Sequence, residues 1–160
     1  MCLRHIISLG LFLMSLAGTG GAWAVDCREE FYFLETQVEV DEFPQDCDSV
    51  IRDIDVSGSP DIRNLDGLAN LTSVGGGLSI FGNGSLTNLD GLANLTSVGR
   101  DLNISGNGFF TNLDGLVSLT SLGGGLYINF ERLTNLDGLA NLTSVRASLP
   151  RIDNSSGDPK

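Results

Sequence analysis

A phrase of 24 residues recurs almost verbatim through the middle of the chain, and it constrains the fold more than any other feature. Three copies fill residues 64–87, 88–111 and 112–134, of which the third is one residue shorter, and a fourth begins at Asn135 and then loses the pattern. Repeats of roughly 20 to 50 residues are typical of solenoids, in which each repeat forms one coil stacked on the last. We therefore expect a stack of coils of about 24 residues.

The apolar residues within one copy indicate how the coil is built. They recur mostly three or four residues apart and alternate with a period of two only at Leu78 and Ile80, which predicts a short strand there. Stacked in register, such strands form a parallel sheet with neighbouring coils about 4.8 Å apart. The other apolar positions would line a narrow core where the chain turns corners. The columns predicted to be buried start in the first copy at Leu65, Leu68, Leu71, Val74, Leu78, Ile80 and Leu86.

Polar residues at fixed places in the copies are expected to support the coil. Asn83 and Asn107 follow the strands, where an inward amide can hydrogen-bond backbone groups of neighbouring coils, and the Asn-Gly pairs suit tight turns. An aspartate precedes Gly-Leu in each copy, which predicts a short helical turn capped by the carboxylate. Because stacked carboxylates attract cations, a calcium ladder is the alternative for this column. The column consists of Asp66, Asp90, Asp114 and Asp137.

The first 24 residues have the pattern of a secretory signal peptide. Arg4 and His5 precede an apolar stretch over residues 6–17, and Ala22 and Ala24 form an A-x-A cleavage site. The apolar stretch is too short to cross a bilayer and no second one is long enough, so we expect no membrane span. The protein is therefore expected outside the cytoplasm, either secreted or in the cell envelope, which means the periplasm or outer surface in a Gram-negative bacterium.

The segment before the first full copy is expected to cap the solenoid. After removal of the leader, Cys27 and Cys47 remain, and two cysteines in an exported protein predict one disulfide, worth about 3 kcal/mol for a loop of this length. Two free thiols or half of a metal site are the alternatives, although no histidine remains after the leader. Thr36 and Glu39 form a capping box that predicts a short helix, which Pro44 should end.

These features divide the chain into four parts. They are a signal peptide at 1–24, an N-terminal cap at 25–50, repeats of the solenoid at 51–149 and a tail at 150–160 that we expect to be disordered. Pro150 interrupts the last coil, and a proline at an open sheet edge prevents pairing with another chain. The alternative is that further coils are missing from this sequence.

Charge and composition narrow the possible functions. The chain carries 20 acidic and 9 basic residues, a net charge of −11, which repels nucleic acid and anionic lipid. Without histidine after the leader, and with lysine only at Lys160, an enzyme would have to use carboxylates and arginine. No carboxylate pair stands out from the repeat, although Asp101 and Asp114 are the residues to test. We therefore predict no catalytic residue, no cofactor and no metal.

The phrase LTNLDGL with LTSVG, the strand pattern Leu78-x-Ile80-x-x-Asn83, and Cys47 ahead of Val50 and Ile54 resemble the receptor L-domain family of leucine-rich-repeat relatives. The resemblance covers about residues 27–149 and is strongest to exported bacterial members. It implies a right-handed, single-stranded parallel β-helix with a helical, disulfide-linked N-terminal cap. The chain lacks the cysteine-rich module, membrane anchor and kinase of the animal receptors, so a signalling role does not carry over.

We expect an exported protein-interaction or surface-binding module without catalytic activity, acting as a monomer on a protein or carbohydrate at the cell surface. The alternatives are a structural protein of the cell envelope or matrix, and a polysaccharide-acting β-helix enzyme that uses carboxylates. Large or polar residues where the copies disagree are typical of recognition surfaces, but covering the coil edges would explain the aromatic ones equally well. The candidate surface consists of Phe81, Asn103, Phe109, Tyr127, Phe130 and Arg132.

Overall fold

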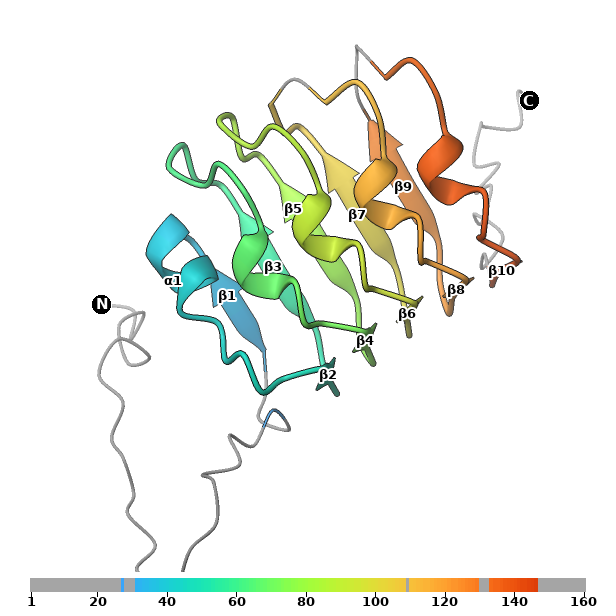
Figure 1. The fold of residues 1–160 in the computed structure, drawn as a ribbon, viewed down its shortest axis with the longest axis horizontal. Helices are drawn as coiled ribbons and strands as arrows, with labels where there is room; N and C mark the ends of the chain where they lie inside the picture. The colour runs from blue at the N-terminus through green and yellow to red at the C-terminus, as the bar shows by residue number, and fades with distance from the viewer. Residues whose placement is uncertain (1–26, 28–30, 109, 130–132, 147–160) are drawn as a thin grey trace, which may run out of the picture.

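The computed structural model describes Cys27 and residues 31–108, 110–129 and 133–146. Their coils lie side by side in a row, with a parallel sheet on each of two sides and helical turns between them (Figure 1). This is a solenoid-like repeat fold, as predicted. The expected signal peptide and tail lie outside the described residues.

Sheet A contains the strand predicted from the alternation of apolar residues. Its described strands follow the order β1-β3-β5-β7-β9 and are all parallel. Each strand pairs with the strand one repeat away, so that Ile54 lies beside Leu78, and Leu78 beside Leu102. The strands are β1 (Tyr32–Leu34), β3 (Ile54–Ser57), β5 (Leu78–Phe81), β7 (Leu102–Ser105) and β9 (Leu126–Asn129).

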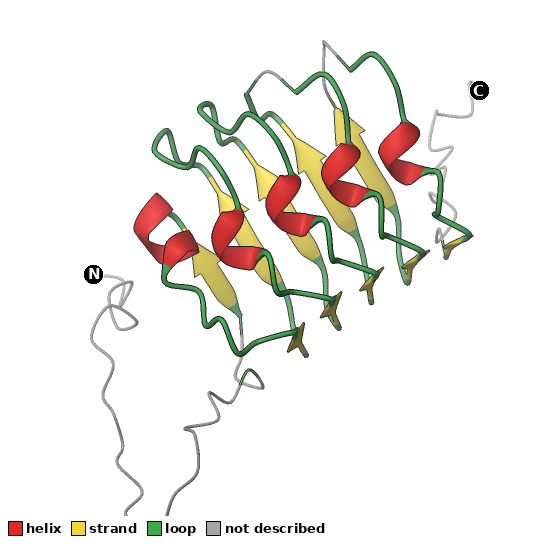
Figure 2. Ribbon diagram, in the orientation of Figure 1, coloured by secondary structure: helices red, strands yellow, loops and turns green. Residues whose placement is uncertain are grey.

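Sheet B was not predicted. Its strands are two residues long, so no alternation of period two can reveal them, and they follow the order β10-β8-β6-β4-β2. Helical turns lie between the two sheets along one side of the stack (Figure 2). The strands are β2 (Ser49–Val50), β4 (Ser73–Val74), β6 (Ser97–Val98), β8 (Ser121–Leu122) and β10 (Ser144–Val145).

The core is a set of stacked apolar columns, as the repeat predicts. The columns that begin at Leu65, Leu68 and Leu78 are buried through the first two copies. At the far end Leu126 and Ile128 are only half-buried, because β9 is the last described strand of sheet A. Each fully buried leucine or isoleucine contributes roughly 1.5–3 kcal/mol, and it is buried mainly by adjacent coils, so the stability of one coil depends on its neighbours.

The Asp-Gly-Leu segments form 3-10 turns, but the aspartate does not cap them as predicted. No side-chain cap bond is made by the residue before each turn, and the aspartate is the first residue of the turn. The cap comes instead from the asparagine two residues earlier: Asn64 Oδ1 accepts from the backbone N–H of Asp66 at 3.1 Å, and the other turns repeat this bond. The turns are η1 (Asp66–Leu68), η2 (Asp90–Leu92), η3 (Asp114–Leu116) and η4 (Asp137–Leu139).

The glycine of each turn is required by the close approach of successive coils. A Cβ on Gly91 would overlap the carbonyl oxygen of Leu65 in the preceding coil, and Gly67, Gly115 and Gly138 are placed in the same way. Backbone atoms cannot yield to a side chain there as a flexible neighbour could. The repeated glycine is therefore a consequence of stacking.

The asparagines after the strands point inward and join the coils, as predicted. Asn83 is fully buried; its Nδ2 donates to the Val56 carbonyl at 2.8 Å and its Oδ1 accepts from the Ser59 N–H at 3.3 Å. Asn107 repeats the first bond, to the Ile80 carbonyl at 2.6 Å. The expected Asn-Gly turn is present at 83–84, where the Leu86 N–H donates to the Asn83 carbonyl at 3.1 Å, and the residue with positive φ is Gly82, just before it.

A second regularity spans two coils rather than one. The Asp53 carboxylate accepts from the Gly77 N–H of the next coil and occupies the space that a Cβ on Gly76 would need. Two coils later Asp101 accepts from the Gly125 N–H at 2.6 Å and fills the space beside Gly124 in the same way. These residues lie at the corner where the chain passes from sheet B to sheet A, and coils with aspartate at this corner alternate with coils that have three glycines.

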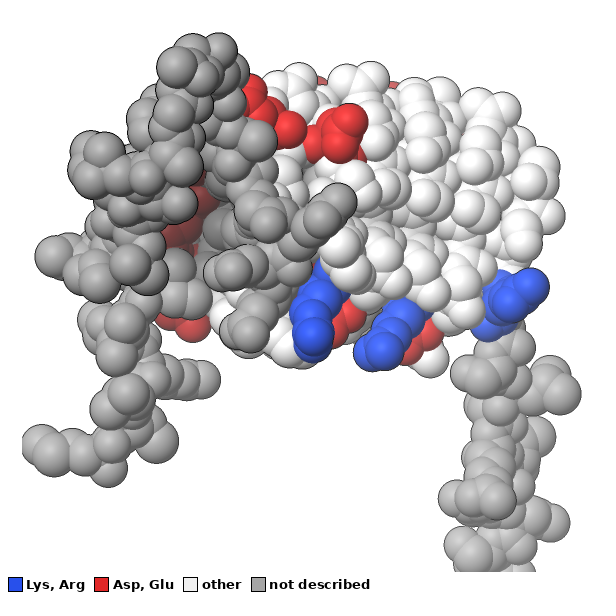
Figure 3. Space-filling view, turned by 90° about the horizontal axis from the view of Figure 1, so that it is seen from below, with Lys and Arg blue, Asp and Glu red and all other residues white. Residues whose placement is uncertain are grey.

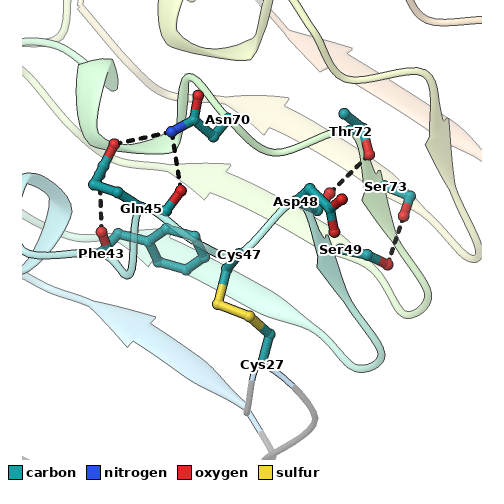
Figure 4. The surroundings of a disulfide bond; sticks show 9 residues. All are labelled: Cys27, Phe43, Gln45, Cys47, Asp48, Ser49, Asn70, Thr72 and Ser73. Atoms are coloured by element: carbon teal, nitrogen blue, oxygen red, sulfur yellow. Dashed lines mark hydrogen bonds between the residues drawn. A yellow bond between two sulfur atoms is a disulfide. The ribbon is translucent and has the colours of Figure 1, made fainter. Parts of the chain in front are cut away.

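The N-terminal cap has the predicted helix and disulfide. Helix α1 (Gln37–Asp41) begins with the Thr36 and Glu39 capping box and ends before Pro44. The Cys27–Cys47 disulfide joins two residues 20 positions apart (Figure 4). Beside it, Asn70 Nδ2 in the first full repeat donates to the Gln45 carbonyl at 3.0 Å, which fastens the cap to the coils.

Candidate functional site

The outer face of sheet A carries a different side chain on each strand. Sheet register places Phe33, Asp55, Ser79, Asn103 and Tyr127 in one row across the five described strands. Parallel strands lie about 4.8 Å apart, so this row is about 19 Å long. The inward neighbours of these residues belong to the apolar core, whereas the row itself faces outward.

The row lines a shallow groove of about 440 Å³, which we call the sheet A groove. The side chains that line the groove are smallest in its middle, at Gly77 just before β5 and at Ser79 on β5, and we call this place the low point. Residues with larger side chains surround that low point on the neighbouring strands. The lining consists of Phe31, Phe33, Asp53, Ile54, Asp55, Gly77, Leu78, Ser79, Asp101, Asn103 and Tyr127.

Aromatic rings close both ends of the sheet A groove. Phe31 and Phe33 stack with ring centroids 6.1 Å apart and are 46% and 56% exposed. Tyr127 is 58% exposed at the other end, and its ring lies back over Gly125. Exposed aromatic rings are large apolar surfaces that the fold has not covered, and such rings are enriched where proteins bind ligands.

Three carboxylates lie between the aromatic ends. Asp53 and Asp101 each accept from a glycine N–H of the next coil, and these bonds fix their orientation. Asp55 lies on β3 in the same coil as Asp53, and its Oδ1 is buried with no hydrogen-bond partner in the described part of the chain. That oxygen has almost no surface that a ligand could reach, so the other carboxylate oxygen of Asp55 is the one available to a donor. The groove lining contains no arginine or lysine.

The structure brings together only part of the surface predicted from the sequence. Asn103 and Tyr127 lie in the sheet A groove, and Asn103 Oδ1 accepts from the Ser105 hydroxyl at 2.7 Å. Phe81 is 51% exposed but lies outside the groove, and its ring packs over Gly106 in the next coil, which fits the alternative that it covers a coil edge. The remaining candidates, Phe109, Phe130 and Arg132, lie outside the described residues.

Sequence reasoning missed the groove residues on the cap side. Residues 31–34 alternate with a period of two, which turns Leu34 inward and both Phe31 and Phe33 outward, but this alternation is too short to indicate a binding face by itself. Asp53 was missed, and Asp101 was named only as a carboxylate to test for catalysis, because their role depends on the glycines of the following coil. The alternation of Arg-Asp and Gly-Gly between copies was the available signal.

A second hollow, of about 560 Å³, follows sheet B. Its lining repeats serine, valine or leucine, and glycine from coil to coil, with Arg146 at one end. The threonines next to this face are already used: Thr96 Oγ1 donates to the Thr72 carbonyl at 2.9 Å, and Thr120 Oγ1 donates to the Thr96 carbonyl at 3.0 Å. This side therefore offers a uniform surface without the chemical variety of the sheet A groove.

Charge is unevenly distributed around the molecule. Seen from below, basic side chains gather along one edge with acidic atoms beside them, and most of the visible described surface is uncharged (Figure 3). Arg52 lies between β2 and β3, at a corner between the two sheets, and its guanidinium lies 6.0 Å from the Phe31 ring centroid. Arg100 occupies the same corner two coils later, since the Gly76 N–H donates to the Arg52 carbonyl and the Arg100 N–H to the Gly76 carbonyl.

Within the described ranges no three histidine, cysteine or acidic side chains come together as candidate metal ligands, and the aspartates of the 3-10 turns make no such group there. None of the helices in this part of the chain has the length and apolar character needed to traverse a bilayer. Asp101 borders the groove and Asp114 begins η3, so the two belong to different columns.

Comparison of the chain with protein-family models, with curated proteins and with solved structures finds no match.

Proposed function

We propose that this protein is an exported, non-catalytic binding module that recognises its ligand in the sheet A groove. The single observation that carries the proposal is the row of five different outward side chains, bounded by exposed aromatic rings, on a frame that otherwise repeats. A buried sheet needs its inward residues to agree between coils, but it places no such demand on outward residues. Exposed aromatic rings around polar groups are typical of recognition surfaces.

The finer description of the fold belongs to the same proposal. We infer a right-handed, single-stranded β-helix like the receptor L domains, with coils of about 24 residues and a monomeric state. The sequence phrase LTNLDGL, the helical cap and the Cys27–Cys47 disulfide support this description. The signal-like leader at residues 1–24, together with a disulfide, supports a location outside the cytoplasm.

The experiment fills the groove and asks whether binding is lost. The purified protein is screened against immobilised oligosaccharides and peptides, and the Ser79→Tyr variant is compared with it. Ser79 lies at the low point of the groove, and tyrosine is well tolerated on strands, so we expect a folded variant that binds at least tenfold more weakly.

Ser97→Tyr is the matched control, because it places the same ring in the hollow along sheet B. It should bind like the original protein, and circular dichroism with urea unfolding should show that both variants are folded. Unchanged binding by Ser79→Tyr would place recognition elsewhere. Absence of any binding by the original protein would favour the structural role in the cell envelope or matrix.

A further inference from the structure

We propose that the sheet A groove takes a linear polysaccharide that carries free amino groups, with the sugar chain lying across the strands along the axis of the solenoid. This inference rests on the proposed function and names the chemical class of ligand for the same site. Its three supports are the spacing of the row, the rings at its ends and the sign of its charge.

The spacing of the row suits a sugar chain better than a peptide. Phe33, Asp55, Ser79, Asn103 and Tyr127 repeat once per strand, at about 4.8 Å. One pyranose ring with its glycosidic oxygen is comparable in length to this spacing, so successive sugars would meet successive strands. An extended peptide presents side chains to one face about every 6.7 Å and would lose register within a few coils.

The rings at the two ends suit the faces of sugars. Phe33 and Tyr127 expose apolar faces against which the C–H bonds of a pyranose can pack, and an ammonium group is attracted to the same faces. Gly77 and Ser79 keep the middle of the groove low, which leaves room for a chain that reaches both ends. A ligand of about four or five sugars would cover the row of about 19 Å.

The charge of the groove selects the amino group. Asp53, Asp55 and Asp101 line it, and the lining has no cation. The first and third carboxylates keep one oxygen on a glycine N–H, and one oxygen of Asp55 is buried, so in each carboxylate the other oxygen is the acceptor that a ligand could use. A ligand with ammonium and hydroxyl donors would supply what these acceptors lack, whereas a polyuronate or sulfated chain would be repelled.

The test measures binding of four soluble probes by isothermal titration calorimetry at low salt. The probes are a glucosamine pentasaccharide, its fully N-acetylated form, a galacturonate pentasaccharide and pentalysine. We expect the glucosamine pentasaccharide to bind at least tenfold more tightly than each of the others, and added salt to weaken it. Ser79→Tyr should abolish this binding.

Charge variants separate recognition from general attraction to an acidic protein. Asp55→Asn should lower the affinity for the glucosamine probe at least fivefold. Its affinity should then be within about twofold of that for the N-acetylated probe. Asp114→Asn removes the same charge from η3 and should change neither affinity by more than about twofold. Thermal unfolding of each variant checks that the fold is retained.

The outcomes distinguish this inference from the function on which it rests. If the N-acetylated or galacturonate probe binds as tightly as the glucosamine probe and Ser79→Tyr blocks it, the amino-group inference is wrong and the binding module stands. If pentalysine binds as tightly, the groove selects cationic peptides and not sugars. If none of the probes binds and the wider screen also finds no ligand, both proposals fail.

Discussion

The two sides of this solenoid differ in how much their residues vary from one coil to the next. The side formed by the 3-10 turns and sheet B presents the same residues in every coil: the first residue of each strand in sheet B is serine, and each turn reads Asp-Gly-Leu. The outer face of sheet A presents phenylalanine, aspartate, serine, asparagine and tyrosine in one row. Because the coils stack in register on both sides, stacking alone does not require this variety. Repetition marks contacts between coils, and variation marks the surface available to a ligand.

The strongest test of this comparison introduces one methyl group on the repeated side. Gly91→Ala places a Cβ against the Leu65 carbonyl of the preceding coil. We expect the free energy of unfolding to fall by about 4 kcal/mol, which is near the upper end for single substitutions. Gly84→Ala is the control, because a Cβ there meets no atom within 4 Å. Urea unfolding measures both. Equal stability of the two variants would show that the coils are not packed this closely.

A smaller effect is expected when an inward asparagine is compared with an outward one. Asn83→Ala leaves the Val56 carbonyl and the Ser59 N–H without their partner inside the core, which should cost about 2 kcal/mol. Asn103→Ala loses one bond to Ser105 at the surface and should cost less than about 1 kcal/mol. Thermal unfolding of both variants shows which one loses more stability. A larger loss for Asn103→Ala would contradict the view that the inward residues hold the coils together and the outward ones do not.

The threonine ladder should show a still smaller effect. Thr96→Val keeps the shape of the side chain but removes the hydroxyl that donates to the Thr72 carbonyl. That carbonyl still accepts the Thr96 N–H at 2.7 Å, so the loss should be about 1 kcal/mol or less. A change in the urea midpoint measures it. A loss as large as that of Asn83→Ala would mean that the hydroxyls carry more of the stacking than their exposure indicates.

The smallest effect on stability is expected on the variable face. Tyr127→Ser removes a ring that is 58% exposed. The free energy of unfolding should change by less than about 0.5 kcal/mol, while the affinity for the ligand falls. Thermal unfolding and the binding screen are run on the same preparation. If stability falls as much as affinity, Tyr127 covers the coil edge and is not part of a site.

Much of the frame could be predicted from the sequence because each repeated residue has a local cause. The period of the copies predicts stacking, the alternation at Leu78 and Ile80 predicts β5, and Thr36 with Glu39 predicts α1. Sheet B escaped prediction because two residues cannot show a period. The carboxylate cap of the turns was wrong because the aspartate is the first residue of each turn and not the residue before it, and an asparagine two residues earlier accepts from its N–H.

The site was harder to predict because it depends on contacts between coils. Tyr127 and Asn103 were found where the copies disagree, but Phe31 and Phe33 lie in the cap, where there is no copy for comparison. Phe81 also differs between copies, yet its ring serves the next coil by packing over Gly106. Variation between copies therefore identified the correct face of the solenoid and only part of the site.

The alternation of Asp53 and Asp101 with glycine corners has a consequence for how such a chain can change in length. Removing residues 64–87 would set the Arg100-Asp101 corner directly against Asp53, where the side chain of Arg100 would take the place of Gly76 and collide with the carboxylate. Removing two consecutive coils would restore an aspartate facing glycines. Duplication or loss of a pair of coils therefore leaves the packing intact, and the pair is the unit in which this molecule can be lengthened or shortened.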